Sequence, residues 1–268
     1  MTAIPLWRWR RIAVAAVVLL WPTVSFAQTD TLVVGAYPAN PPWENKRDDG
    51  TFEGFEVDVV NEIGNRIGAD IEIQDYDFQP LFSATSSGRI DMAISSITVT
   101  NERLQNQSFT QPYYDADLGL AARSDSGITT LEGLAGQPVG ALSGSTGETW
   151  IQENTEQYGF GEYSGYDTQQ ALLLDLQNGR VAGAVSDITG LQFSFQQMEG
   201  MEVVQRIRSG EQYAIMMQKG SPNLERVNDA ITAMKEDGTM AALHEKWLGG
   251  APDPETSTVT VLEIPQAQ

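Results

Sequence analysis

The chain has 268 residues, of which 41% are hydrophobic and 9% aromatic, and these proportions exclude a disordered or collagen-like protein. Sixteen basic residues against 36 acidic ones give a net charge of −20, so the chain lacks the cationic surface that nucleic-acid binding requires. The sequence contains no cysteine, which excludes disulfides, thiolate metal sites, cysteine nucleophiles and a lipid anchor on an N-terminal cysteine. The length is sufficient for two domains.

The first 27 residues have the features of an export signal. Arginines at positions 8, 10 and 11 precede an apolar run, residues 12–21, that is too short to span a bilayer. Ser25 and Ala27 supply the small residues of a cleavage site, so we expect cleavage near Ala27 and a periplasmic protein without a lipid anchor. Cleavage would leave 13 basic residues against 36 acidic ones, a net charge of −23. An uncleaved membrane anchor is the alternative.

The first half of the mature chain alternates between strands and helices. Prolines interrupt residues 37–43, which predicts a loop there. The elements expected around this loop are strand 31–36, helix 55–67, strand 70–74, helix 79–87 and strand 90–94. Strand–helix–strand order at this spacing is typical of an α/β protein with a parallel sheet and crossover helices.

One nine-residue segment occurs in two similar copies, 91 residues apart. Residues 88–96 read GRIDMAISS, and residues 179–187 read GRVAGAVSD. In each copy a glycine ends a helix, a short strand follows, and two polar residues come at the carboxyl end of the strand, where open α/β sheets bind ligands. The similarity is either chance in a common turn or the sign of two similarly built lobes, and we favour the two lobes.

The second half of the chain continues the alternation and ends in helices. The expected elements are strand 137–142, helix 149–158, helix 168–177, strand 181–185, strand 212–217, helix 223–236 and helix 240–248. Residues 251–268 contain proline and threonine without a helical period, and we expect them to form a flexible tail.

Arg103 and the hydroxyls upstream of it are candidates for binding an anion. Thr100 is suited to cap a helix, which puts Arg103 in the first turn, where the helix dipole disfavours a cation. Either a surface arginine tolerates this small cost, or Arg103 offers its planar guanidinium to a carboxylate. Ser95, Ser96 and Thr98 bring hydroxyls and backbone groups to the same region.

The segment 140–148, GALSGSTGE, is a second candidate anion site. Ser145 and Glu148 have capping-box spacing, so a helix begins here after a strand, and the neighbouring glycines let a ligand approach the free backbone N–H groups. The segment lacks the lysine of a phosphate loop, and Ser143 stands where a nucleophile elbow needs its first glycine. An ordinary helix cap is the alternative.

Asp187 ends a hydrophobic strand, and its carboxylate would either cap the helix that begins at Ile188 or accept a cation. We favour the cation, because the corresponding residue of the other copy, Ser96, lies in the segment of Arg103. An arginine and exposed amides for an anion, with an aspartate and hydroxyls for a cation, suit a zwitterion that carries a carboxylate and an ammonium on one carbon. Buried charges require partners, so a cleft between two lobes would close around such a molecule.

Seven segments, in this order, resemble the periplasmic solute-binding proteins of polar amino-acid ABC importers, bacterial solute-binding protein family 3. They are GAYPANPPWE (35–44), GFEVDVVNEIG (54–64), GRIDMAISSITVTNER (88–103), QPYYD (111–115), GSTGE (144–148), GRVAGAVSD (179–187) and NDAITAMKEDGTMAALHEKWLG (228–249). The resemblance implies a two-lobed type II periplasmic-binding-protein fold with a hinge of two crossing strands. Lobe 1 would comprise residues 30–118 and 212–250, and lobe 2 residues 119–211.

The resemblance also implies three groups of site residues. The first group would bind the ligand α-carboxylate: Arg103 and the backbone N–H of Thr146. The second group would bind its α-ammonium: Asp187, Ser96 and Thr98. The third group comprises Phe78, which would lie over the ligand, and the loop residues Tyr37, Asn40 and Trp43, which would help to recognise the ligand side chain.

The ligand side chain is left open by this resemblance. Tyr37 stands where members that take cationic amino acids carry an aspartate, which weakens the case for arginine, lysine or histidine. The aromatic residues and Asn40 would suit a neutral polar or aromatic side chain, or a compact betaine- or ectoine-like solute held by cation–π contacts.

We expect this protein to capture an amino acid by lobe closure and to deliver it to the permease of an ABC importer, as a monomer without cofactor or metal. The alternatives are a cleft enzyme of the same fold, a prephenate-type dehydratase, and a ligand sensor that presents itself to a receptor. The single histidine, His244, falls in the terminal helix and disfavours an enzyme, although Glu148 or Asp187 could serve as a lone acid.

Overall fold

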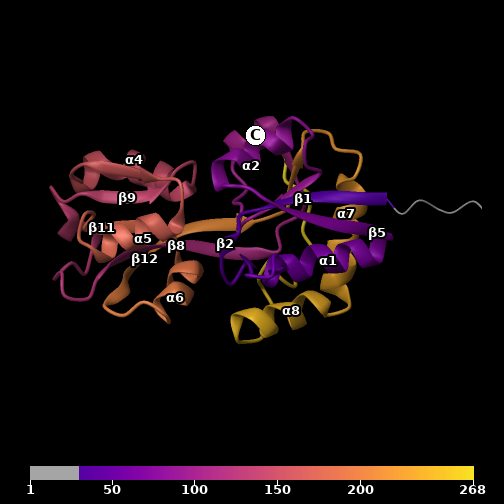
Figure 1. Ribbon diagram of the computed structural model, residues 1–268. Helices are drawn as coiled ribbons and strands as arrows, with labels where there is room; N and C mark the ends of the chain where they lie inside the picture. Colours follow the sequence, from indigo (N-terminus) through magenta and orange to yellow (C-terminus); the bar gives the residue numbers. More distant parts are fainter. Residues whose placement is uncertain (1–29) are drawn as a thin grey trace, which may run out of the picture.

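The computed structural model describes residues 30–268, which form two α/β lobes connected by long strands (Figure 1). The expected export signal and its cleavage site lie outside the described residues. No helix in the described part of the chain combines the length and apolar character needed to cross a membrane.

The sheet of lobe 1 has five strands. In spatial order they are β5 (Ala69–Asp75), β1 (Asp30–Ala36), β6 (Met92–Ile94), β13 (Met216–Gln218) and β7 (Gln107–Phe109). β1 is parallel to β5 and β6, whereas β13 is antiparallel to both of its neighbours. The sheet is therefore mixed, and the expectation of a parallel sheet is wrong here, because β13 enters directly from a strand that returns from lobe 2 and not through a crossover helix.

Helices cover both faces of this sheet. They are α1 (Phe55–Ile67), α2 (Phe78–Ser86), α3 (Asn101–Asn106), α7 (Leu224–Glu236) and α8 (Thr239–Leu248). α1 has the bounds that its apolar spacing predicts, and it ends at Gly68, whose φ of 69° belongs to the left-handed region. Alternate β1 residues point to opposite faces, so Leu32 and Val34 pack with α1, α7 and α8, while Val33 packs with α2.

The sheet of lobe 2 also has five strands. In spatial order they are β10 (Tyr163–Tyr166), β9 (Val139–Leu142), β11 (Gly183–Asp187), β8 (Tyr114–Arg123) and β12 (Met201–Tyr213). Its helices are α4 (Thr146–Tyr158), α5 (Gln169–Gln177) and α6 (Ile188–Phe195), with a 3₁₀ turn at Leu131–Leu134. A small sheet of β2 (Ala39–Asn40), β3 (Glu44–Lys46) and β4 (Phe52–Glu53) extends from lobe 1.

The two copies of the repeated segment occupy equivalent places in the two lobes. Gly88 and Gly179 follow α2 and α5 with φ values of 69° and 73°, the left-handed conformation that the helix ends predict. Each copy then supplies the middle strand of a five-stranded sheet, β6 in lobe 1 and β11 in lobe 2. The carboxyl ends of these strands bring Ser96 and Asp187 to one pocket between the lobes.

The lobes are connected by β8 and β12, which pair antiparallel from Tyr114 and Tyr213 at one end to Arg123 and Met201 at the other. Both strands cross from one lobe to the other in Figure 1. These two strands form the predicted hinge, and the predicted fold class, a two-lobed α/β binding protein, is confirmed. The pairing is irregular between Ile207 and Glu211, so the returning strand bends where it leaves lobe 2.

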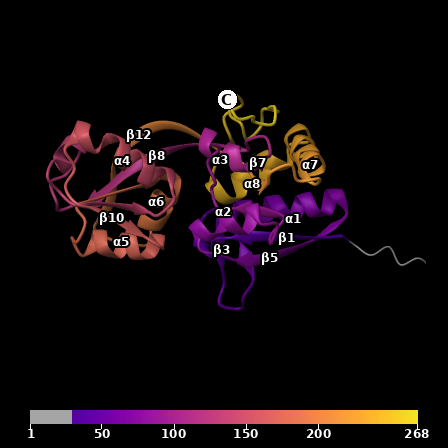
Figure 2. The same ribbon diagram turned by 90° about the horizontal axis from the view of Figure 1, so that it is seen from above.

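Residues 251–268 contain no regular element, but they lie against lobe 1 instead of extending as the flexible tail that we expected. Ser257 and Thr258 are 3% and 1% exposed. The backbone N–H of Ser257 donates to Asp115 at 2.8 Å, and Lys235 Nζ donates to the carbonyl of Thr260 at 2.9 Å. The segment ends beside α3 (Figure 2), where Gln268 N donates to the side chain of Asn101. Its partners are distant in sequence, and local composition therefore did not reveal them.

Candidate ligand-binding site

A cavity of about 50 Å³ lies between the lobes. Lobe 1 contributes Tyr37, Asn40, Phe78, Ser95, Ser96, Thr98 and Arg103 to its lining. Lobe 2 contributes Leu142, Ser145, Thr146, Gly147, Gln169, Ser186 and Asp187. The hinge strands contribute Leu118, Glu211 and Tyr213. The structure thus brings together eight of the nine residues predicted from the sequence, and only Trp43 is absent from this lining.

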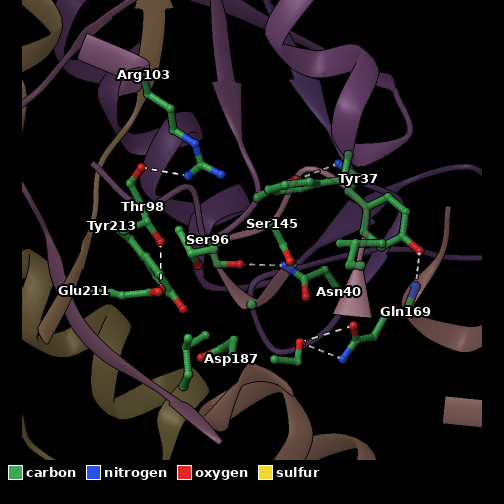
Figure 3. Close-up of a pocket in the computed structure, with 17 residues that line it drawn as sticks. Tyr37, Asn40, Ser96, Thr98, Arg103, Ser145, Gln169, Asp187, Glu211 and Tyr213 are labelled. Carbon is green, nitrogen blue, oxygen red and sulfur yellow. Dashed lines mark hydrogen bonds between the residues drawn. The ribbon is translucent and has the colours of Figure 1, made fainter. Parts of the chain in front are cut away.

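Arg103 reaches from α3 into one end of the cavity (Figure 3). Its Nη1 donates to the carbonyl of Thr98 at 2.8 Å and its Nη2 to the carbonyl of Gly144 in lobe 2 at 3.1 Å. The guanidinium carbon lies 4.8 Å from the centre of the Phe82 ring. Thr100 caps α3 by accepting a hydrogen bond from Arg103 N, as its position in the sequence predicts.

The charge of Arg103 is not neutralised by an ion pair with any carboxylate among residues 30–268. Burial lowers the pKa of Arg103 to about 10, and the more distant charge of Glu211 only partly opposes this shift. A guanidinium that is desolvated without an acidic partner is an energetically unfavourable arrangement. A carboxylate arriving from solution would relieve it.

The first turn of α4 lies in the same part of the cavity. Ser145 caps the helix by accepting a hydrogen bond from Glu148 N at 3.2 Å, while the Glu148 carboxylate accepts one from Gly144 N at 2.6 Å. The backbone N–H groups of Thr146 and Gly147 belong to the first turn, whose donors have no acceptor within the helix. Gly147 is required here, because a Cβ would lie 2.5 Å from the carbonyl oxygen of Val185. This positive end of α4 and Arg103 together suit an anion.

Asp187 lies in another part of the cavity, at the carboxyl end of β11. Its Oδ1 accepts from Thr189 N at 3.2 Å and its Oδ2 from Gly190 N at 2.8 Å, so it caps α6. The helix-cap alternative is therefore present in the structure, and the same carboxylate also lines the cavity. Burial raises the pKa of Asp187, and the hydrogen bonds from Trp43 and from the α6 amides oppose that shift.

Trp43 is fully buried and stands behind the site. Its ring packs edge-on against Tyr114 and Tyr213 at centroid distances of 4.6 and 5.4 Å. Its indole Nε1 donates to Asp187 Oδ2 at 2.8 Å across the lobes. The expectation that Trp43 contacts the ligand side chain does not match this position, because its ring completes the core of lobe 1 and its polar edge supports Asp187.

Ser96 and Asn40 are held together at the middle of the cavity (Figure 3). Asn40 Nδ2 donates to Ser96 Oγ and to Glu44 Oε1, both at 3.1 Å. Ser96 has a φ of 46°, rare for a residue with a side chain, and its N–H donates to both oxygens of Glu56 at 3.0 Å. The buried Glu56 therefore stabilises the strained backbone that presents the Ser96 hydroxyl.

Two buried acids, Glu44 and Glu56, lie directly behind these residues, and both are 0% exposed. Burial raises the pKa of Glu44 well above the ordinary glutamate value, and the charge of Glu56 raises it further. Glu56 accepts hydrogen bonds from the Tyr113 hydroxyl and from Ser96, which favour its charged form. The hydrogen bonds to Glu56 oppose the effect of burial on its pKa, so Glu44 is the member of the pair that holds its proton more tightly.

Glu211 and Gln169 also line the cavity, and neither is among the site residues predicted from the sequence. Glu211 belongs to hinge strand β12, and its Oε2 accepts from Thr98 Oγ1 at 2.8 Å. Asp187 was predicted as a site residue because it is an acidic residue at the end of a hydrophobic strand. Glu211 is likewise an acidic residue next to a predicted strand. Gln169 begins α5, and its side-chain amide exchanges hydrogen bonds with the Ser186 hydroxyl at 3.1 and 3.2 Å. Nothing in the local sequence distinguishes it from a surface glutamine.

Two sheets of similar construction, a hinge of two strands, and a pocket with groups of both charges between the lobes define a two-lobed ligand-binding protein. The family of bacterial extracellular solute-binding proteins, family 3, matches residues 32–250, and the chain belongs to this family. The C-terminal segment 251–268 follows the matched region.

Named relatives of this family are similar to the chain over most of its length. The L-cystine-binding protein TcyJ of Escherichia coli K12 is 29% identical over 223 residues, which are 82% of this chain and 83% of TcyJ. The arginine-binding extracellular protein ArtP of Bacillus subtilis is 29% identical over 222 residues, 82% of this chain and 86% of ArtP. The structure of an ancestral arginine-binding protein bound to arginine superposes with a TM-score of 0.76 at 33% identity, covering 82% of this chain and 98% of that one.

Proposed function

We propose that this protein binds an amino acid between its lobes in the periplasm and delivers it to the membrane permease of an ABC importer. Membership of the solute-binding family supports the transport role, and relatives named for binding cystine, arginine and histidine support the ligand class. The single observation that carries the proposal is the desolvated Arg103 guanidinium, which lines an interlobe cavity without an acidic partner among residues 30–268.

In this proposal the two charged ends of the ligand have separate partners. The α-carboxylate binds the Arg103 guanidinium and the free N–H groups of Thr146 and Gly147 at the start of α4. The α-ammonium binds Asp187 and the Ser96 hydroxyl. Thr98 supports the site indirectly, because it accepts a hydrogen bond from Arg103 and donates one to Glu211.

Lobe closure is favoured because the binding groups come from both sides of the hinge. Arg103 and Ser96 belong to lobe 1, whereas Thr146 and Asp187 belong to lobe 2. A ligand that contacts both sets stabilises the closed state relative to the open one by these additional contacts. We propose that the closed, liganded form is the one the permease receives.

A binding role, and not catalysis, agrees with the position of the single histidine. His244 Nδ1 lies 2.8 Å from the carbonyl oxygen of Gly250, and its ring stacks on Tyr114 at a centroid distance of 6.0 Å. His244 is absent from the lining of the interlobe cavity. The acids that do line the cavity, Asp187 and Glu211, are held by hydrogen bonds from helix amides and from Thr98.

A thermal-shift screen of the mature chain, which we propose begins after Ala27, tests this function. The ligands are the twenty amino acids, cystine, ectoine and glycine betaine. We expect at least one amino acid to raise the Tm with an affinity near micromolar, about −8 kcal/mol, because closure offsets part of the contact energy. At 100 times Kd such a ligand adds about 2.7 kcal/mol to the free energy of unfolding. The proposal is wrong if no amino acid shifts the Tm and calorimetry detects no binding.

A further inference from the structure

Tyr37, in the loop after β1, connects the two lobes at one edge of the cavity. Its backbone N–H donates to the buried Ser95 Oγ at 2.9 Å. Its hydroxyl donates to Gln170 Oε1 at 2.9 Å and accepts from Gln169 N at 3.2 Å. Gln170 Nε2 donates back to the carbonyl of Ala39 at 3.0 Å. Three hydrogen bonds therefore join this loop of lobe 1 to the first turn of α5 in lobe 2, and we call them the Tyr37 clasp.

The clasp lies where the side chain of a bound amino acid would point. With the α-carboxylate at Arg103 and the α-ammonium at Asp187, the third substituent of the α-carbon turns away from both charges. Figure 3 shows Tyr37 and Gln169 on the side of the pocket opposite Arg103, with Asn40 between Tyr37 and Asp187. Tyr37 is 3% exposed, so its ring is a fixed wall at that end.

The space in front of this wall is small. The cavity of about 50 Å³ corresponds to about four water positions. The α-carboxylate, α-carbon and α-ammonium of any amino acid already fill most of that space. A long side chain would have to displace Tyr37 and break the clasp, and the lobes would then lose three hydrogen bonds that favour closure.

The groups at this end of the cavity are neutral. Gln169 and Ser186 hydrogen bond to each other, and the Asn40 amide is held by Ser96 and Glu44. The nearby acid Glu44 is fully buried and does not line the cavity. A cationic side chain would therefore meet no carboxylate there, because Asp187 is used by the α-ammonium.

A larger groove lies beside the ligand cavity, and Tyr37 does not line it. It has a volume of about 400 Å³, and its apolar lining includes Leu173 and Leu174 of α5, Phe193 of α6, and Met198 in the turn after α6. It shares Asn40, Gln169, Ser186 and Asp187 with the ligand cavity, so the same side chains separate the two spaces. A long ligand would reach this groove only if the separating side chains moved.

We propose that Tyr37 limits the length of the ligand side chain, so that this protein takes amino acids with short neutral side chains, such as alanine and serine, and rejects long ones. This inference rests on the proposed amino-acid binding. It sets this chain apart from its relatives named for arginine and cystine, whose side chains are much longer. Tyr37 is a specificity-determining residue in this account.

Calorimetric titration of four proteins, the wild type and three variants, with alanine, serine, leucine, methionine, arginine and cystine tests the inference. We expect the wild type to bind alanine or serine at least 100-fold more tightly than arginine or cystine. Tyr37→Ala removes the wall, and the preference for alanine over leucine and methionine should fall at least tenfold. Tyr37→Phe keeps the ring and loses the hydroxyl, so all ligands should weaken by a similar factor and keep their order. Tyr166→Phe is the matched control, because it removes a tyrosine hydroxyl bonded to Asp175 within lobe 2.

The outcomes distinguish the two proposals. A wild-type protein that binds arginine or cystine as tightly as alanine overturns the inference and leaves amino-acid binding intact. An unchanged ligand order in Tyr37→Ala, with circular dichroism showing a folded protein, also overturns it. If Tyr37→Ala does not fold, a changed ligand order in Tyr37→Phe contradicts the wall. Binding of no amino acid by the wild type overturns the proposed function and the inference with it.

Discussion

Replacing Arg103 with alanine separates ligand binding from folding more sharply than any other single change in this site. The guanidinium makes two hydrogen bonds to carbonyl groups and a cation–π contact with Phe82, but it has no ion pair among residues 30–268. Losing these neutral contacts costs about 1–2 kcal/mol of stability, and removing a desolvated charge recovers part of it. We expect the free energy of unfolding of the unliganded protein to change by less than about 1 kcal/mol.

The effect on ligand binding should be much larger. Truncating one partner of a desolvated, hydrogen-bonded charge pair costs about 2–5 kcal/mol, which corresponds to a loss of affinity of about 30-fold to several thousand-fold. Arg103→Lys keeps the charge but cannot offer two parallel N–H groups, so it should fall between wild type and Arg103→Ala. Arg180→Ala is the control, because Arg180 pairs with Asp175 on the surface of lobe 2.

Isothermal titration calorimetry with the best ligand from the screen measures the affinity, and urea denaturation of the unliganded proteins measures stability. An affinity within threefold of wild type for Arg103→Ala would refute the assignment of the carboxylate site. A large loss of stability with unchanged affinity would show that Arg103 is a structural residue and that its position in the cavity has no role in binding.

Three further predictions concern Asp187, the buried acids and the C-terminal segment. Asp187→Asn still caps α6 but loses its charge. Titration calorimetry should therefore show a larger loss of affinity, relative to wild type, for the amino acid than for its N-trimethylated form. Equal losses for the two ligands would contradict the ammonium site. Because the pKa of Glu44 is raised above the ordinary value of 4.5, the folded state holds its proton more tightly, and the free energy of unfolding should fall as the pH rises above about 4.5. Glu44→Gln should flatten this dependence in urea denaturation, and an unchanged slope would show that other groups cause it. Deletion of residues 251–268 removes the hydrogen bonds to Asp115 and Lys235 and should lower the free energy of unfolding by about 2–3 kcal/mol without changing which ligands bind, whereas unaltered stability would mean that the segment is not held in solution.

Sequence patterns predicted the secondary structure well where the determining contacts are local. The helix at 55–67 follows from apolar spacing and a terminal glycine, and the helix after Ser145 follows from the capping-box spacing of Ser145 and Glu148. The repeated segment correctly indicated equivalent strands, β6 and β11, in two similar sheets. The pairing of strands that are distant in the sequence was harder to predict. Nothing local indicates that the stretch after Tyr213 would join β6 antiparallel.

The cavity residues likewise fall into those that local sequence patterns predict and those that only the folded chain brings together. Arg103 could be predicted because a cation in the first turn of a helix is unfavourable, and Ser145 because it is a favourable N-cap residue. Trp43 was placed wrongly, since an aromatic residue in a proline-rich loop is equally compatible with a ligand contact and with the core. Gln169 was missed because only the folded α5 brings it to the other lining residues, whereas Glu211 was missed although it is an acidic residue beside a predicted strand, as Asp187 is.

The most direct test of this account compares one ligand with two analogues that each lack a charged end. The best-binding amino acid, its amine without the carboxylate and its acid without the ammonium are titrated into the same protein by calorimetry. If Arg103 and Asp187 hold opposite ends of the ligand, each analogue should bind at least 100-fold more weakly than the amino acid. An analogue that binds within threefold of the amino acid would contradict the account.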